Sequence, residues 1–173
     1  KYLRNKIKLN EKLIIYVRGN SWNLASNAIH FIDLFYFLLQ KKSKFKEIST
    51  NQIKIIPSKR FGYLEVTGKV KLINSNFDQI ILEDKTTNRK NILVVKIING
   101  KQEFIINESL LNAKLKFDNK VLNKKIKILK QSELSKLYIQ KIFDKKSIEL
   151  PSLIDSLNSN DILFKLFYKI FKN

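Results

Sequence analysis

The chain has 173 residues, enough for one ordinary domain with its own core plus an appendage, but hardly for two full domains. Its 34 Lys and Arg residues stand against 15 Asp and Glu residues, giving a formal net charge of +19. This excess favours an anionic partner, with nucleic acid before an anionic membrane surface or a solvated basic face. The absence of cysteine excludes disulfides and thiolate metal sites, and the single histidine excludes sites that need two imidazoles. We therefore expect no metal and no cofactor.

The sequence shows no membrane-spanning segment and no targeting signal. The longest apolar stretch, residues 28–39, is too short to cross a bilayer and contains Asp33, so we interpret it as a buried helix. We expect no stable membrane insertion. Lys, Ile and Asn dominate, whereas the sequence holds only four Gly and two Pro. This composition points to an AT-rich gene.

The first elements are clear from the pattern. Residues 12–19 are β-branched and aromatic and end at Gly19-Asn20, which predicts a strand followed by a turn. Ser21 can cap the next segment, Trp22–Gln40, which has no Gly or Pro and repeats apolar residues at three- and four-residue steps. A helix is predicted there. Its C-terminal half is apolar almost all round, so a second covering layer is expected from the tail of the chain or from a neighbour.

Two long extended segments follow, over 52–73 and 79–98, with only residues 74–78 between them, so they indicate a long hairpin. Asn99-Gly100 predicts a turn, a shorter helix is expected from about residue 107, and a last strand over 124–130. The order of elements predicts an α+β fold, a ferredoxin-like βαββαβ domain over 12–131. Its extended hairpin, between the second and third strands, would cover about 52–98, and residues 1–11 would form a basic N-terminal arm.

Residues 132–173 are predicted to be a helical C-terminal extension that Pro151 divides. Its last helix, from Asp161, is amphipathic. The helix either docks on a partner or membrane surface, or covers the exposed half of the first helix within the same protein. For docking, the predicted protein-partner contacts are Phe164, Phe167 and Phe171.

No catalytic residue is predicted. The only side chain that ordinarily titrates near neutrality is His30, which lies among Ile29, Phe31 and Ile32, so a structural or partner-facing histidine is expected. The carboxylates of Asp78, Glu83 and Asp84 sit among lysines, as in ion pairs. The four glycines stand alone at 19, 62, 68 and 100, so no phosphate-binding Gly-rich loop exists. The expectation is that the chain is not an enzyme.

Basic residues cluster within or beside the expected hairpin. Cations along a two-stranded ribbon can follow phosphates, while exposed Phe61 and Tyr63 can stack or wedge. Pro57 and Ser58 would shape the ribbon with these aromatics. The predicted RNA-binding residues are Lys41, Lys42, Lys44, Lys46, Lys54, Lys59, Arg60, Lys69, Lys71, Lys85, Arg89 and Lys90.

The run IKIIPSKR (53–60) resembles the Ile-x-Leu-Pro-Thr-Lys-Lys-type motif of the small-subunit ribosomal protein ten family. TNRK (87–90) is similar to that family's Thr-His-Lys-Arg run, with Asn88 in place of the histidine, and DQ (78–79) is similar to its acidic-Gln pair. The resemblance covers about residues 12–130.

The resemblance implies a structural constituent of the small-subunit head that binds small-subunit rRNA and adjoins ribosomal proteins three, nine and fourteen. The AT-rich gene favours a mitochondrial ribosome, with a plastid or the cytoplasm of an AT-rich bacterium as alternatives. Two other functions stay open: a stand-alone basic DNA- or RNA-binding regulator, and a peripheral membrane-surface protein that uses the last helix.

Overall fold

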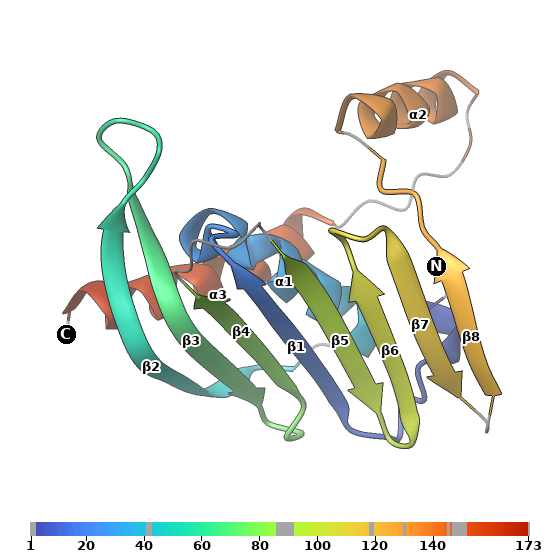
Figure 1. Ribbon diagram of the computed structural model, residues 1–173, viewed down its shortest axis with the longest axis horizontal. Coiled ribbons are helices and arrows are strands. Elements are labelled where there is room, and N and C mark those ends of the chain that lie inside the picture. Colours follow the sequence, from blue (N-terminus) through green and yellow to red (C-terminus); the bar gives the residue numbers. More distant parts are fainter. Residues whose placement is uncertain are drawn as a thin grey trace.

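The computed structural model describes residues 3–40, 43–85, 92–117, 120–129, 131–144, 146 and 152–172. They form one mixed eight-stranded sheet in the order β2-β3-β4-β1-β5-β6-β7-β8 (Figure 1). The strands are β1 (Leu13–Asn20), β2 (Phe45–Pro57), β3 (Leu64–Asn74), β4 (Gln79–Lys85), β5 (Leu93–Asn99), β6 (Gln102–Asn107), β7 (Asn112–Phe117) and β8 (Lys120–Lys125). The helices are the short 3-10 turn η1 (Arg4–Lys6), α1 (Leu24–Leu39), α2 (Gln131–Phe143) and α3 (Leu153–Lys172).

The centre of the sheet is β1, in which Leu13, Ile15 and Val17 are buried and alternate with less buried residues. This period of two places the apolar side chains on the face that the helices cover. β1 pairs in parallel with β4, with Ile14 opposite Gln79, and antiparallel with β5 on its other side. The remaining neighbours pair antiparallel.

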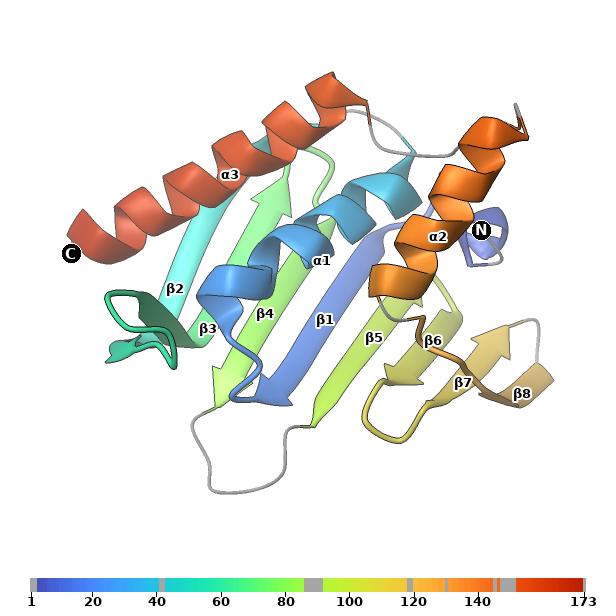
Figure 2. The ribbon, with the colours of Figure 1, turned by 90° about the horizontal axis from the view of Figure 1, so that it is seen from above.

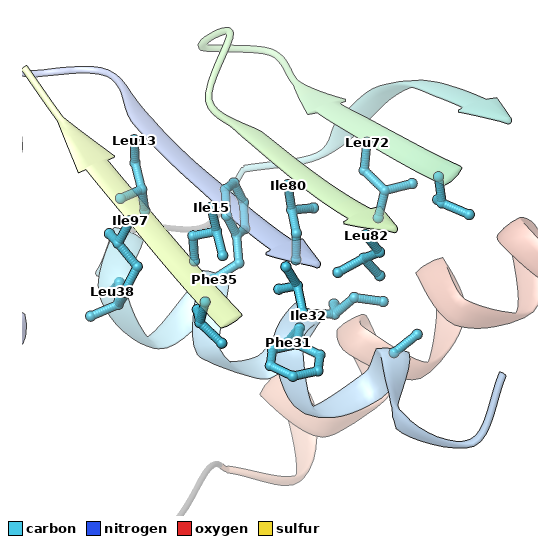
Figure 3. Close-up of a cluster of buried hydrophobic side chains, with 14 of the residues drawn as sticks. Leu13, Ile15, Phe31, Ile32, Phe35, Leu38, Leu72, Ile80, Leu82 and Ile97 are labelled. Carbon is cyan, nitrogen blue, oxygen red and sulfur yellow. The ribbon is translucent and has the colours of Figure 1, made fainter. Parts of the chain in front are cut away.

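Helix α1 lies across this face. Its buried side chains are Leu24, Ala28, Phe31, Ile32, Phe35, Leu38 and Leu39, a stripe with helical spacing. In Figure 3, Phe35 and Ile32 of α1 meet Ile15 of β1 and Ile80 of β4. Fully burying a side chain of this size contributes about 1.5–3 kcal/mol, so this cluster is the main source of stability.

Helix α3 lies beside α1 on the same face, over the β2 end of the sheet (Figure 2). It buries Ile162, Leu166 and Ile170 in the common core. This is the second covering layer that the all-round apolar half of α1 required, and it comes from the chain's own tail. The predicted domain boundaries themselves stay a prediction.

The β2–β3 hairpin projects beyond the rest of the sheet (Figure 1). β3 pairs with β4 only between Gly68 and Ile73, whereas its pairing with β2 continues to Leu64. At Gly68 the register of the ribbon shifts, and φ is +118°, a conformation that favours glycine. Pro57 ends β2, which is an edge strand, so its missing N–H leaves no partner unpaired within the sheet.

The predicted ferredoxin-like βαββαβ fold is wrong, because the described residues form an eight-stranded sheet and the second predicted helix is replaced by strands. The segment expected to be helical from about residue 107 is instead β6 and β7 with a turn between them. Phe104 faces the core on β6, and Ala113, Leu115 and Phe117 do so on β7, which is strand alternation. Each predicted long strand is in fact two strands, and no helix among the described residues has the length and apolarity to cross a membrane.

Candidate active site

A polar stripe runs along the side of α1 that faces away from the sheet. With 3.6 residues per turn, Ser26, His30, Asp33 and Phe37 share this side, opposite the buried residues. Ser26, His30 and Phe37 are exposed, and Asp33 is half-buried. We call these four residues the outer stripe. The chain's single histidine is thus on the surface, with a hydroxyl one helical turn before it and a carboxylate one turn after it.

Two buried carboxylates fix the N-terminal end of α1. Glu65 of β3 accepts hydrogen bonds from the Ala25 amide at 3.1 Å and from the Ser26 hydroxyl. Asp84 of β4 accepts from the amides of Trp22 and Leu24, both at 3.3 Å. Glu65 and Asp84 are 4% and 2% exposed, so both carboxyl groups lie inside the protein. Negative groups stabilise this end of a helix because it presents unpaired N–H groups and the positive end of the dipole.

Burial raises the pKa of Asp84 above its ordinary value, although hydrogen bonds from four backbone amides act in the opposite direction. Because the two carboxylates already fill the amide end of α1, that end has no room for a further anion such as a phosphate.

The turn between β1 and α1 is held as tightly as the helix end. The Trp22 ring nitrogen donates to the backbone oxygen of Glu83 at 3.0 Å, and the ring meets Phe31 edge-on at 5.3 Å. A Cβ on Gly19 would lie 2.5 Å from the backbone oxygen of Ile92 and 2.7 Å from the Trp22 ring, so only glycine fits there. The first turns of α1, and with them Ser26 and His30, therefore stand on a rigid base.

The flank of α1 toward α3 carries Tyr36. Burial and the negative charge of Asp161 raise its pKa to about 12, and its hydroxyl donates to the backbone oxygen of Ser43 at 3.3 Å. Tyr36 therefore stays protonated at neutral pH and acts as a hydrogen-bond donor.

The outer stripe suits proton transfer and hydrogen bonding. Imidazole is the side chain that ordinarily exchanges a proton near neutral pH. On either side of it, Asp33 and the Ser26 oxygen, whose proton goes to Glu65, can accept hydrogen bonds from hydroxyl groups. Within the described residues, no group of three His, Asp or Glu side chains lies where a metal ion could be held. The stripe thus supports acid–base chemistry on a polar molecule.

The described residues that were predicted to bind RNA come from several elements at the β2 end of the sheet. Lys69 and Lys71 alternate with buried Val70 and Leu72, so they lie on the face of the sheet opposite the helices. The other described ones are spread over the approach to β2, β2 itself, the turn 58–63 and the end of β4: Lys44, Lys46, Lys54, Lys59, Arg60 and Lys85. Lys41, Lys42, Arg89 and Lys90 lie outside the described residues.

The predicted hairpin-shape residues lie at the turn between β2 and β3, and not inside one long strand as expected. The amide of Ser58 donates to the backbone oxygen of Tyr63 at 2.9 Å, which closes the turn directly after Pro57. Phe61 is fully exposed at its tip. The predicted partner contacts lie on α3, where Phe164 and Phe171 are exposed and Phe167 is half-buried; their contact with a partner stays a prediction.

Sequence reasoning found His30 but gave it no chemical role, and it missed Ser26, Glu65 and the capping role of Asp84. A signal for the stripe was present: Ser26, His30, Asp33 and Phe37 are spaced by four, three and four residues. The contacts of Glu65 and Asp84 join residues at least 39 apart in the sequence, and no local pattern marks them.

No protein-family model matches the sequence, and no curated protein matches it. Solved structures do match. UDP-N-acetylglucosamine 3-dehydrogenase GnnA from Acidithiobacillus ferrooxidans superposes with a TM-score of 0.69 at 7% identity, over 96% of this chain and 56% of that one. Dehydrogenase MviM from Clostridium difficile gives a TM-score of 0.61 at 13% identity, over 97% of this chain and 58% of that one.

A third match is a variant of KijD10, a 3-ketoreductase from Actinomadura kijaniata, in complex with TDP-benzene and NADP. It has a TM-score of 0.62 at 10% identity, over 95% of this chain and 54% of that one. At these identities the comparisons show a common fold. The chain spans a little over half the length of the proteins it matches.

These findings overturn the resemblance to small-subunit ribosomal protein ten. The fold is that of oxidoreductase and dehydrogenase domains, so a ribosomal function with rRNA and ribosomal proteins as partners is wrong. The two alternatives, a stand-alone nucleic-acid-binding regulator and a peripheral membrane-surface protein, gain no support either. The same matches contradict the expectation that the chain is not an enzyme, because the solved structures that share its fold are oxidoreductases and dehydrogenases.

Proposed function

We propose that this chain is the substrate-binding and proton-transferring domain of a Gfo/Idh/MocA-type oxidoreductase that interconverts a secondary alcohol and a ketone. One observation carries the proposal: in a fold shared with such enzymes, the chain's single histidine stands exposed in the outer stripe, on a helix whose end is fixed by Glu65 and Asp84. The names of two matched proteins, a 3-dehydrogenase and a 3-ketoreductase, favour a sugar as the substrate class.

In the oxidation, the hydroxyl O–H bond breaks and its proton passes to the imidazole of His30. The C–H bond breaks with its electron pair, which leaves as hydride and creates the carbonyl. In the reverse direction His30 returns the proton to the carbonyl oxygen. Asp33 accepts a hydrogen bond from one neighbouring hydroxyl group, and Ser26 Oγ, whose own proton goes to Glu65, accepts from another; the two orient the reacting carbon over His30.

Such a reaction needs a two-electron acceptor, and the NADP in one matched structure suggests a nicotinamide dinucleotide. The residues of this chain do not fit the pyrophosphate of such a cofactor. The sequence has no Gly-rich loop, Gly19 stands alone between β1 and α1, and the amide end of α1 is already filled by Glu65 and Asp84. We therefore place the acceptor on a different domain and derive no step through it.

The test is turnover of the protein produced from its natural gene, followed through reduced nicotinamide with nucleotide-linked sugars as candidate substrates. Replacing His30 by Ala or Gln is expected to lower kcat by about 100- to 10,000-fold, the usual contribution of a general acid–base group. Lys101→Ala, an exposed change in the turn between β5 and β6, serves as the matched control.

The His30→Ala, His30→Gln and Lys101→Ala proteins should all unfold at the temperature of the unchanged protein, because each variant changes an exposed side chain. A His30→Gln protein that turns over at the full rate on a substrate accepted by the unchanged protein would refute the assignment.

A further inference from the structure

Three aromatic side chains project from the outer side of α3. Phe164, Tyr168 and Phe171 are 71%, 66% and 50% exposed, and they recur at steps of four and three residues. They lie opposite the buried Ile162, Leu166 and Ile170, so α3 is apolar on two sides. We call Phe164, Tyr168 and Phe171 the aromatic ridge.

The aromatic ridge is built as a surface rather than as scattered residues. Phe167 lies 6.1 Å from Phe171, and the ammonium of Lys172 sits 5.2 Å above the Tyr168 ring. Contiguous exposed aromatic surface is uncommon on a monomer and typical of the core of a protein interface.

The ridge adjoins the outer stripe. Helices α1 and α3 lie side by side on the same face of the sheet (Figure 2), so the sides opposite their buried residues both face away from the sheet. The two helices are in contact, and Tyr36 of α1 and Leu163 of α3 pack against the same core. The apolar aromatic ridge of α3 thus lies alongside the polar outer stripe of α1.

We propose that the aromatic ridge is the docking surface for the dinucleotide-binding domain that brings the hydride acceptor to His30. This inference rests on the proposed function, which requires an acceptor that the chain itself does not fit. A domain that carries the acceptor must meet the outer side of α1, and the aromatic ridge is the apolar surface that adjoins it. The matched oxidoreductases are nearly twice as long as the part that this chain spans, which leaves room for such a domain in proteins of this fold.

The absence of cysteine from this chain allows a direct measurement of what covers the ridge. Tyr168→Cys places one thiol on the ridge, and Phe77→Cys places one in the turn between β3 and β4, where Phe77 is 69% exposed. In the protein produced from its natural gene, maleimide labelling of each thiol is followed by peptide mapping. If the ridge is docked, Cys at 168 should react at least about tenfold more slowly than Cys at 77, the change that 1.4 kcal/mol of protection gives.

A second pair of variants tests what the docking does. Phe164→Glu should weaken docking about 30-fold, as the loss of a central aromatic anchor does, and lower turnover accordingly. Phe77→Glu should leave turnover unchanged. Melting temperatures near that of the unchanged protein establish that both variants fold.

The outcomes separate this inference from the proposed function. If His30→Gln abolishes turnover but Cys at 168 labels as fast as Cys at 77 and Phe164→Glu is fully active, the docking surface is wrong and the proposed function stands. If the ridge is protected but His30→Gln remains active, the docking stands and the role of His30 fails. Protection that disappears on dilution, with turnover unchanged, would mean that a second copy covers the ridge and would overturn the inference.

Discussion

The carboxylate of Glu65, on β3, accepts a hydrogen bond from the backbone amide of Ala25, in the first turn of α1, at 3.1 Å. The same carboxylate binds the hydroxyl of Ser26. The base of the projecting hairpin and the start of the outer stripe are therefore one connected unit. A change at this buried carboxylate will be felt both in stability and in the position of Ser26.

Replacing Glu65 by Ala should lower the free energy of unfolding by about 2–3 kcal/mol, because the Ala25 amide and the Ser26 hydroxyl lose their acceptor. Glu65→Gln keeps an acceptor oxygen and should cost about 1 kcal/mol. Urea unfolding measures both. Glu47→Ala, at an exposed position of β2, is the matched control and should change stability by less than about 0.5 kcal/mol. Equal losses for Glu65→Ala and Glu47→Ala would contradict the capping role.

Asp84 should give the protein a particular pH dependence. Burial raises its pKa in the folded state above the ordinary 3.8, so the folded protein binds this proton more tightly than the unfolded chain does. The resulting stabilisation is complete below 3.8 and is lost as the pH rises through the raised value. The unfolding free energy of the unchanged protein minus that of Asp84→Asn should therefore fall as the pH rises across this acidic range. A difference that stays flat, or rises with pH, would show that the pKa is not raised.

Gly19→Ala should destabilise the fold by about 1–3 kcal/mol through overpacking. The added Cβ would approach the backbone oxygen of Ile92 to 2.5 Å and the Trp22 ring to 2.7 Å, and a backbone carbonyl cannot move aside as a flexible side chain can. Thermal unfolding monitored by circular dichroism measures the effect, with Lys101→Ala as reference. An unchanged melting temperature would mean that the turn before α1 is looser than described.

Two neighbouring residues of α3 should respond very differently to truncation. Leu166 is fully buried in the core, so Leu166→Ala should cost about 2–5 kcal/mol. Phe164 is 71% exposed, so Phe164→Ala should stay within about 0.5 kcal/mol in this chain alone. Chemical denaturation distinguishes the two. Similar losses would mean that the ridge side of α3 is packed within this chain and not available to a second domain.

Some of the fold could be predicted from the sequence. The strand predicted at 12–19 and the helix predicted from Trp22 to Gln40 agree closely with β1 and α1. In each segment the apolar residues recur with a regular period, and the turn residues Gly19-Asn20 separate the two. The apolar excess of α1 also predicted a covering layer, but left open whether the last helix or a neighbour supplies it. These features depend on local pattern and on the need to bury apolar surface.

The rest of the fold depends on turns that have few of the residues typical of turns. The turn between β6 and β7 contains no Gly or Pro, and Leu111 adopts a positive φ of 51° within it, so a helix was predicted across it. Pro57 and Gly62 flank the turn that separates β2 from β3, yet the β-branched residues on either side suggested one continuous strand.

The site was obscured for a related reason. His30 was judged by its sequence neighbours Ile29, Phe31 and Ile32, which all point elsewhere on the helix. Its true surroundings are Ser26 and Asp33, one turn away on either side. The excess of lysine instead favours a nucleic-acid interface at the hairpin. Net charge alone, however, does not determine which chemistry a fold performs.

The central place of β1 also determines how the chain can fold. β1 precedes both of its neighbours in the chain, and they pair with it through residues as distant as Gln79 and Asn99. Closing such long loops before any contact forms makes folding slow, whereas β2 and β3 can pair locally. Until β4 emerges from the ribosome, Leu13, Ile15 and Val17 form an apolar strand with no partner on either side, which is the type of segment that chaperones protect from aggregation.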